Sequence, residues 1–209
     1  YSLWVNVYGV SERYLNVYGE KDLRAQMNQF FHRTYTHPVD GTTLDMKMLC
    51  NWYWYDETAI LETGKGTKDW NFYRYAETLL SAAEAIAQSS GVNAEAAGYL
   101  AQVKARANME GKDVSTIASE LQRLGKQAFI EECWKERLRE FPLEMKIWDD
   151  CVRTGKFPQI SATNKGEVQF VDLIGAKNGS GATFKATDLY WPIPVNEIQR
   201  NPNLTQNEG

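Results

Sequence analysis

One long helical signal, at residues 70–87, constrains the fold of this chain more than any other segment. Its apolar residues recur at intervals of three and four and would form one stripe along a helix, with Asp69 as the expected N-cap. The stripe is rich in alanine, which lets a second helix approach closely. We therefore expect a packing helix without chemistry of its own, with its stripe formed by Tyr73, Ala76, Leu80, Ala83 and Ala87.

The segment after this helix supplies a neighbour for it. Ser89, Ser90 and Gly91 would end the first helix, and Asn93 can cap a second one that runs to about residue 108. Two such helices joined by a short turn are typical of tetratricopeptide-like pairs. One pair cannot bury both of its faces, so we expect neighbouring helices. Further helical stretches are predicted at residues 113–141 and 143–153, on either side of Pro142.

Charge and cysteine content exclude several classes of function. The net charge is −4 and the basic residues are dispersed, so no nucleic-acid partner is expected. No apolar run approaches the length of a membrane span. Cys50, Cys133 and Cys151 show no metal-binding spacing, and buried free thiols are favoured over a Cys133–Cys151 disulfide. The loop at residues 62–69 fails the phosphate-loop pattern, and we expect neither a metal nor a cofactor.

Aromatic residues are concentrated in the first part of the chain. Of the 26 aromatic residues, 16 lie in the first 75 positions, and four of them are consecutive in the run NWYWYD at residues 51–56. Such a run fits a strand buried on both faces, or a binding platform on which sugar rings stack while amides and carboxylates bind hydroxyl groups. The candidate ligand-binding residues of the platform are Trp52, Trp54, Tyr35, Asn51 and Asp56.

Short strands are expected around the helices. Residues 3–10 alternate apolar and polar side chains, residues 13–19 form a weaker strand, and residues 33–36 read as extended. Residues 166–187 predict two strands, EVQFVDLI and ATFKA, on either side of a glycine-rich loop. The last twenty residues are rich in Pro and Asn, so we expect irregular structure there except for a turn of helix at residues 195–199.

Four charged residues around Pro142, in the third and fourth helical stretches, allow a catalytic interpretation. Glu136, Glu140 and Glu144 are carboxylates that a glycoside hydrolase could use, but no second group of acids stands apart from them. The interleaved Arg137 fits ion pairing better. We therefore expect no enzymatic activity and no catalytic residues.

Three motifs in the same order resemble the SusD/RagB family. They are RYAETLLSAAEA at residues 74–85, ERLREFPLE with the following WDD and RTGK at residues 136–156, and PIP with NPNLTQN at residues 192–207. The element KDLRAQMNQFF at residues 21–31 resembles the family's D-x-R element more loosely. The chain departs from the pattern at Ile147, where Arg is usual, and at Met145, where Gly is common.

The resemblance implies a mainly α fold. Members of the family have an α-helical superhelix with tetratricopeptide-like hairpins, short β-strands and long loops, and this chain resembles the C-terminal part. We expect an aromatic-rich segment at residues 1–68 and the family's C-terminal helical domain at residues 69–209. The remaining N-terminal part, with its signal peptide and lipidated cysteine, should precede Tyr1.

The resemblance also implies a function. The family comprises lipid-anchored nutrient-binding proteins on the outer-membrane surface of Bacteroidetes, which deliver oligosaccharides or polysaccharides to SusC-like TonB-dependent transporters and catalyse nothing. We expect glycan capture through the aromatic platform, with a peptide as another possible nutrient. The alternative is a docking module for the transporter, without a ligand site in this segment.

Overall fold

The computed structural model describes residues 9–207, which form two compact units. The first unit comprises the chain through Lys146 together with Ile160–Val168, and the second comprises Ile147–Gln159 and the chain from Gln169 onward. The predicted division of the chain after residue 68 is based on where the aromatic residues are concentrated, not on contacts between residues. It stays a prediction.

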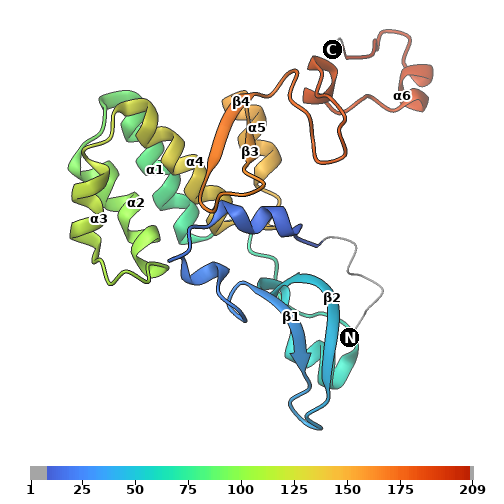
Figure 1. Ribbon diagram of the computed structural model, residues 1–209. Helices are drawn as coiled ribbons and strands as arrows, with labels where there is room; N and C mark the ends of the chain where they lie inside the picture. Colours follow the sequence, from blue (N-terminus) through green and yellow to red (C-terminus); the bar gives the residue numbers. More distant parts are fainter. Residues whose placement is uncertain (1–8, 208–209) are drawn as a thin grey trace. The chain divides into compact units, whose positions relative to one another are not determined.

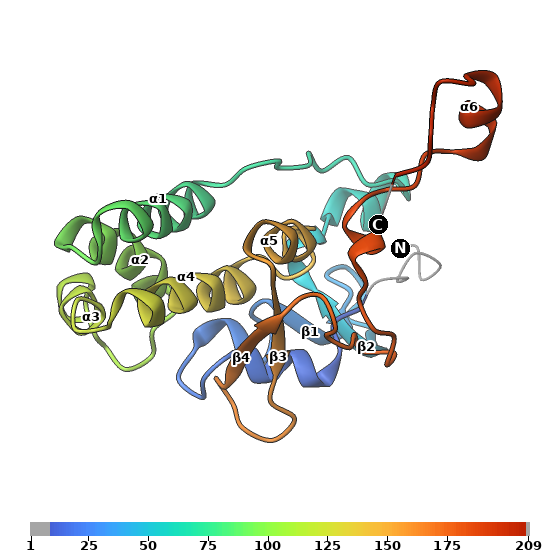
Figure 2. The same cartoon turned by 90° about the horizontal axis from the view of Figure 1, so that it is seen from above.

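Four helices form the larger part of the first unit. In Figure 1 and Figure 2 they lie side by side, and α1 contacts both α2 and α4, while α2 also contacts α3. Outside this group the first unit has short 3-10 turns and one two-stranded sheet, which confirms the expected mainly α fold with short strands. The helices are α1 (Tyr75–Ser90), α2 (Ala94–Arg106), α3 (Val114–Leu121) and α4 (Lys126–Glu140).

The alanine stripe is the buried face of α1, whose most extensive contact is with α2. Leu80, Ala83 and Ala87 are fully buried, as are Leu100 and Ala101 on α2. Each buried leucine contributes about 1.5–3 kcal/mol relative to an exposed one, and the alanines allow the close approach of the two helices.

The start of α1 differs from the prediction. The helix begins at Tyr75, with Arg74 at the N-cap position, and not after Asp69. Tyr73 is 78% exposed and lies outside the buried stripe. Arg74 is extended because its side chain is held by two carboxylates of the segment at residues 140–144, as described below. The second helix begins as predicted, with the Asn93 side chain accepting a hydrogen bond from the amide of Ala96 at 2.9 Å.

The residues before the sheet form turns rather than a strand. The expected strand at residues 13–19 is wrong, because Ser11 caps a 3-10 helix, η2 (Glu12–Val17). A second 3-10 turn, η3 (Leu23–Ala25), is capped by Asp22. The expected strand at residues 3–10 lies outside the described residues except at its end, where Val10 forms an antiparallel bridge to Leu49.

The two-stranded sheet carries the aromatic run at its end. Strands β1 (Phe31–Thr36) and β2 (Thr43–Asn51) pair antiparallel, with Phe31 opposite Asn51 and Thr36 opposite Thr43. The strand then stops, and the aromatic run continues as a 3-10 turn, η4 (Trp52–Trp54), followed by a short π-helical turn, η5 (Ala59–Thr63). The interpretation of NWYWYD as a buried strand is therefore wrong.

The second unit pairs its strands differently from the prediction. Helix α5 (Ile147–Thr154) leads into strand β3 (Lys156–Ile160), which pairs with β4 (Val168–Asp172). The predicted ATFKA strand is wrong, since that segment forms only a bridge between Lys177 and Thr183. Strand β3 is not expected from the sequence because it contains Pro158, which is tolerated in a sheet of only two strands. Two short turns follow, η6 (Ala186–Leu189) and the expected α6 (Val195–Arg200).

Candidate functional site

The first of the sequence-predicted residues, Trp52, lies between two other rings. The His32 ring stacks on it with centroids 3.8 Å apart and an interplanar angle of 9°, and the Tyr55 ring with centroids 4.4 Å apart and an angle of 12°. Two rings centred this close to one indole could not both lie on the same face without overlapping. The rings of His32 and Tyr55 therefore cover opposite faces of Trp52. The indole of Trp52 therefore has only its edges available to a ligand.

Tyr35 lies behind this stack and is 6% exposed. Its ring centroid lies 6.0 Å from those of both Trp52 and Tyr55. Desolvation, together with a hydrogen bond to the Tyr35 side chain, raises the pKa of Tyr55 to about 12. Tyr35 therefore supports the stack from within.

The two polar candidates, Asn51 and Asp56, hold the backbone around the aromatic turn. The Asn51 side chain accepts a hydrogen bond from the amide of Tyr53 at 3.0 Å and donates one to the carbonyl of Pro142 at 2.5 Å. Asp56 accepts hydrogen bonds from three backbone amides, those of Ala59, Thr67 and Lys68. The hydrogen bond from the Thr67 amide, followed by that from the Ala59 amide, lowers the pKa of Asp56. Both residues fix the shape of the turn.

Trp54 lies on the outer side of the aromatic turn. Its ring is perpendicular to that of Tyr53, at 4.8 Å, and it is tilted against Trp70 at 4.6 Å. Trp70 is 49% exposed. Above the ring of Tyr53 lies the ammonium of Lys68, 5.1 Å from the centroid. Trp54 and Trp70 thus form a partly open aromatic pair, which we call the outer pair.

A cavity of about 280 Å³ lies beside the aromatic turn. Aromatic and amide groups line one part of it, and four charged side chains line the rest. Its lining comprises Gln29, Phe30, Asn51, Trp52, Tyr53, Arg74, Arg106, Glu140, Pro142 and Glu144. An aromatic wall with converging polar groups is the usual composition of a small-molecule site.

The charges of this cavity are paired with one another. Arg74 donates to both carboxylate oxygens of Glu144 at 2.8 Å and to Glu140 at 3.0 Å, and Arg106 also donates to Glu140. The Arg74 guanidinium lies over the rings of Tyr53 and Phe141, at 5.6 and 4.8 Å from their centroids. Two guanidinium groups thus face two carboxylates, and the cavity has no charge left over for an ionic ligand.

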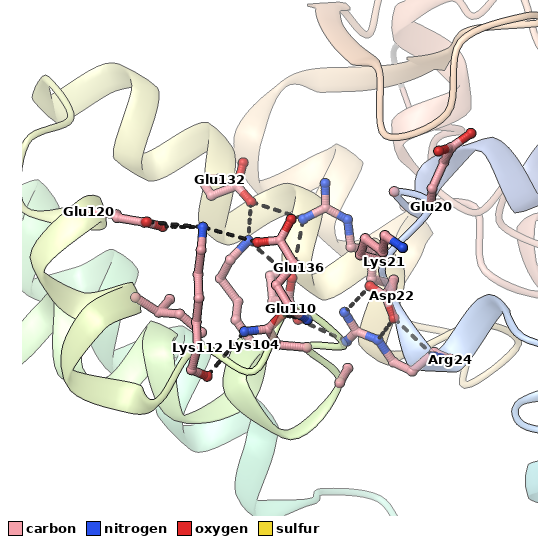
Figure 3. Close-up of a pocket in the computed structure, with 15 residues that line it drawn as sticks. Glu20, Lys21, Asp22, Arg24, Lys104, Glu110, Lys112, Glu120, Glu132 and Glu136 are labelled. Atoms are coloured by element: carbon pink, nitrogen blue, oxygen red, sulfur yellow. Dashed lines mark hydrogen bonds and ion pairs between the residues drawn. The ribbon is translucent and has the colours of Figure 1, made fainter.

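A second cavity, of about 450 Å³, is lined mainly by charged side chains (Figure 3). Lys112 lies between Glu110 and Glu120, 3.0 Å from each, and Lys104 pairs with Glu132 at 2.5 Å. The lining carries six carboxylates and five basic groups, so these ion pairs leave the cavity close to neutral. Among residues 9–207, no group of three acidic, histidine or cysteine side chains is arranged to hold a metal ion.

Deeper in this cavity lies a buried ion network. Arg24, which is 4% exposed, donates to Asp22 at 2.7 Å, to Glu136 at 2.8 Å and to Glu140 at 3.0 Å. Burial by itself would raise the pKa of Glu136, but the charges of Arg24, Lys104 and Arg139 more than offset it and lower the pKa. The carboxylates of α4 thus form ion pairs, as expected from the sequence, and the D-x-R element meets the ERLREF motif through Arg24.

The sequence alone does not indicate a role for Trp70, Tyr53 or the two arginines of the smaller cavity. Its periodicity predicts Trp70 in the helix, although Asn71 and the extended Arg74 separate Trp70 from the first helical turn. Arg74 belongs to the RYAE motif, and that motif is the sequence signal that could have identified it. Arg106 carries no such signal, because its position at the end of α2 matters only once α4 lies beside it.

The three cysteines, all within the described residues, form no disulfide. Cys133 and Cys151 are both free thiols, and desolvation raises the pKa of each, to about 12 for Cys151. Among the described helices, none combines the length and the apolar composition needed to span a bilayer.

Comparison with known proteins gives three matches. The SusD family profile matches residues 13–209. Over 137 residues the chain is 35% identical to the starch-binding protein SusD of Bacteroides thetaiotaomicron, and the match covers 66% of this chain and 21% of that protein. A crystal structure of a SusD superfamily protein from Parabacteroides distasonis is similar with a TM-score of 0.79 and 31% identity, over 95% of this chain and 41% of that one. The chain thus spans less than half the length of these relatives.

Proposed function

This chain belongs to the SusD family, and from that premise we propose that it captures glycans without chemically altering them. The observation that carries the proposal is the outer pair beside a cavity with an aromatic wall and internally paired charges. Partly open indoles can stack on the C–H faces of sugar rings, and the paired charges favour an uncharged ligand. The relative named as a starch-binding protein supports a glucan as the first ligand to test.

The binding mode follows from which groups remain accessible. Trp54 and Trp70 would stack on successive sugar rings, each stack contributing on the order of 1 kcal/mol. Arg106, whose side chain is 56% exposed, would donate hydrogen bonds to hydroxyl groups at the cavity. Trp52, Tyr35, Asn51 and Asp56 would act by holding the turn in shape, and Trp52 would add edge contacts.

The proposal includes the place of the protein in the cell. As in the family it resembles, it would be lipid-anchored at the outer-membrane surface through a cysteine upstream of this segment. There it would pass oligosaccharides to a SusC-like TonB-dependent transporter.

Titration of intrinsic tryptophan fluorescence with maltoheptaose tests the capture function. Binding should change the emission, and Trp54→Ala and Trp70→Ala should each weaken the affinity about fivefold, corresponding to the loss of one stack. Tyr75→Ala is the matched control, because Tyr75 is a 72% exposed aromatic residue outside the outer pair. Chromatography of the sugar after long incubation should show no shorter products.

Two results would contradict the proposal. Unchanged affinity in both tryptophan variants would remove the outer pair from the binding site. Shorter sugars that appear with time would show that the protein is a hydrolase.

A docking module remains the second candidate, and one observation favours it. Just before α1, Phe72 and Tyr73 are 75% and 78% exposed, and such aromatic side chains are enriched at protein interfaces. Co-purification with a SusC-like transporter should then fail after Phe72→Ala and Tyr73→Ala. If docking is the function of this segment, maltoheptaose should not change the tryptophan fluorescence of the unmodified chain. It should not change the fluorescence of these two variants either.

A further inference from the structure

The second unit contains a cavity of about 670 Å³ with three aromatic residues in its wall. Trp148 comes from α5, and Tyr190 and Trp191 come from the segment after η6. Their exposed fractions are 36%, 61% and 88%, respectively, so their rings are open to solvent. No residue of this cavity belongs to the site proposed in the first unit.

Hydrogen bonds to the backbone hold the wall of this cavity. The Gln206 side chain accepts from the amide of Ile193 at 2.8 Å and donates to its carbonyl at 3.0 Å. The Asn207 side chain donates to the carbonyl of Trp191 at 2.7 Å. On the other wall, Trp148 packs against Phe184 with centroids 5.7 Å apart. The rings are thus presented by a backbone that is tied at several points, which lowers the entropy cost of binding.

The remaining lining groups define the chemistry of a ligand. The cavity contains no lysine or arginine, and its one carboxylate, Asp188, uses one oxygen to accept from the amide of Lys185 at 2.9 Å. The other Asp188 oxygen and the Thr187 hydroxyl have no hydrogen-bond partner among residues 9–207, so both are available to a ligand. Open rings next to hydroxyl and carboxylate acceptors suit a neutral molecule with apolar faces and many hydroxyl groups.

We propose that this cavity, with Trp148, Tyr190 and Trp191 as its stacking surface, is a second binding site for neutral oligosaccharides. An anionic sugar is disfavoured because it would meet a carboxylate and no cation. An apolar peptide is disfavoured because the only aliphatic lining residues are Leu189 and Pro192. The volume lies within the range of sites that enclose small ligands.

Indole N–H signals in two-dimensional nitrogen–proton NMR of the 209-residue chain test this site directly. The seven tryptophans can be assigned by single Trp→Phe variants. Addition of maltoheptaose, cellohexaose or mannohexaose should shift the signals of Trp148 and Trp191 with one common affinity. Trp191→Ala should weaken that affinity about fivefold or more, and Val195→Ala, a 66% exposed residue outside the cavity, should leave it unchanged.

The outcomes separate this site from the one in the first unit. Shifts of Trp148 and Trp191 in a Trp54→Ala, Trp70→Ala double variant would support the second site even if the first site binds nothing. If none of the three sugars moves these two signals, the proposal is overturned, whatever Trp54 and Trp70 do. It is also overturned if Trp191→Ala keeps full affinity while circular dichroism shows the fold intact.

Discussion

A single residue, Met145, shows how a departure from the family pattern appears in the structure. Met145 has a φ of 59° and Leu143 also has a φ of 59°, in the left-handed region that favours glycine. Between them lies Glu144, whose carboxylate accepts two hydrogen bonds from Arg74. The strained turn thus places Glu144 against Arg74, and the glycine common at position 145 in the family relieves part of this strain.

We expect Met145→Gly to stabilise the protein by about 0.5–1 kcal/mol, because glycine adopts a positive φ without the steric cost that methionine incurs. Little packing should be lost, since Met145 is 68% exposed. Urea unfolding measures the change. Met109→Gly, at a 47% exposed residue without a positive φ, should instead lower the stability, and a loss of stability in Met145→Gly would contradict the strain argument.

Glu140 is the residue on which the ion network depends most. It is fully buried and accepts hydrogen bonds from Arg24, Arg74 and Arg106. Glu140→Gln should destabilise the fold by about 3 kcal/mol, because buried guanidinium groups lose their counter-charge. In the same urea experiments Asp45→Ala, which breaks an exposed pair with Lys47, should cost less than about 1 kcal/mol. Equal effects of the two changes would argue against the network.

Acid should weaken the fold through the same network. Desolvation acts to raise the pKa values of Glu132 and Glu136, but nearby basic side chains outweigh it and lower both. A carboxylate with a lowered pKa contributes stability above its unfolded pKa of about 4.3, and this contribution is lost as the pH falls below that value. The free energy of unfolding should therefore drop between pH 5 and pH 3, roughly the window in which the unfolded carboxylates take up protons. Glu132→Gln should make that drop shallower, and an equally steep drop would contradict the assignment.

Between elements, the packing of α1 against its neighbouring helices depends on side-chain size. Ala83 is fully buried on α1, whereas Ala85, two residues later on the same helix, faces solvent. Ala83→Leu should destabilise the fold by about 1–3 kcal/mol, because the added atoms force the helices apart. Ala85→Leu makes the same chemical change on the exposed face and should be nearly neutral, within about 0.5 kcal/mol. Thermal unfolding of the two variants would compare them directly, and similar melting temperatures would refute the close-packing argument.

The aromatic turn shows how an element changes the meaning of its residues. By sequence alone, the run NWYWYD fits either a buried strand or a binding platform. The strand ends at Asn51, and the turn that follows covers Trp52 on both faces while Trp54 meets Trp70. Consecutive residues of one run therefore have different roles, one inside a stack and one in a partly open pair.

At the scale of the whole molecule, the two compact units carry separate proposed sites with no residue in common. Independent sites contribute additively, so the chain should bind two equivalents of a short oligosaccharide such as maltoheptaose. Isothermal titration calorimetry should give a stoichiometry near two. Trp191→Ala should weaken the affinity of one site only, and a Trp54→Ala, Trp70→Ala double variant should weaken the affinity of the other site only. A stoichiometry of one, with an affinity that only one of these variants weakens, would leave a single site.

The helices, the buried alanine stripe and the ion pairing of the α4 carboxylates followed from local patterns of the sequence. Helical periodicity and small-residue faces are properties of one segment, so a single sequence contains the information. The motifs also indicated the family, because three of them occur in a fixed order.

Other features depend on residues that are far apart in the chain. The pairing of β3 with β4, the start of α1 at Tyr75 and the positive φ of Met145 each result from contacts that no local pattern encodes. The same is true of the aromatic residues, since His32 covers one face of Trp52 and Trp70 contacts Trp54. The sequence indicated that aromatic residues would gather here, but only long-range packing decided which rings remain open to a ligand.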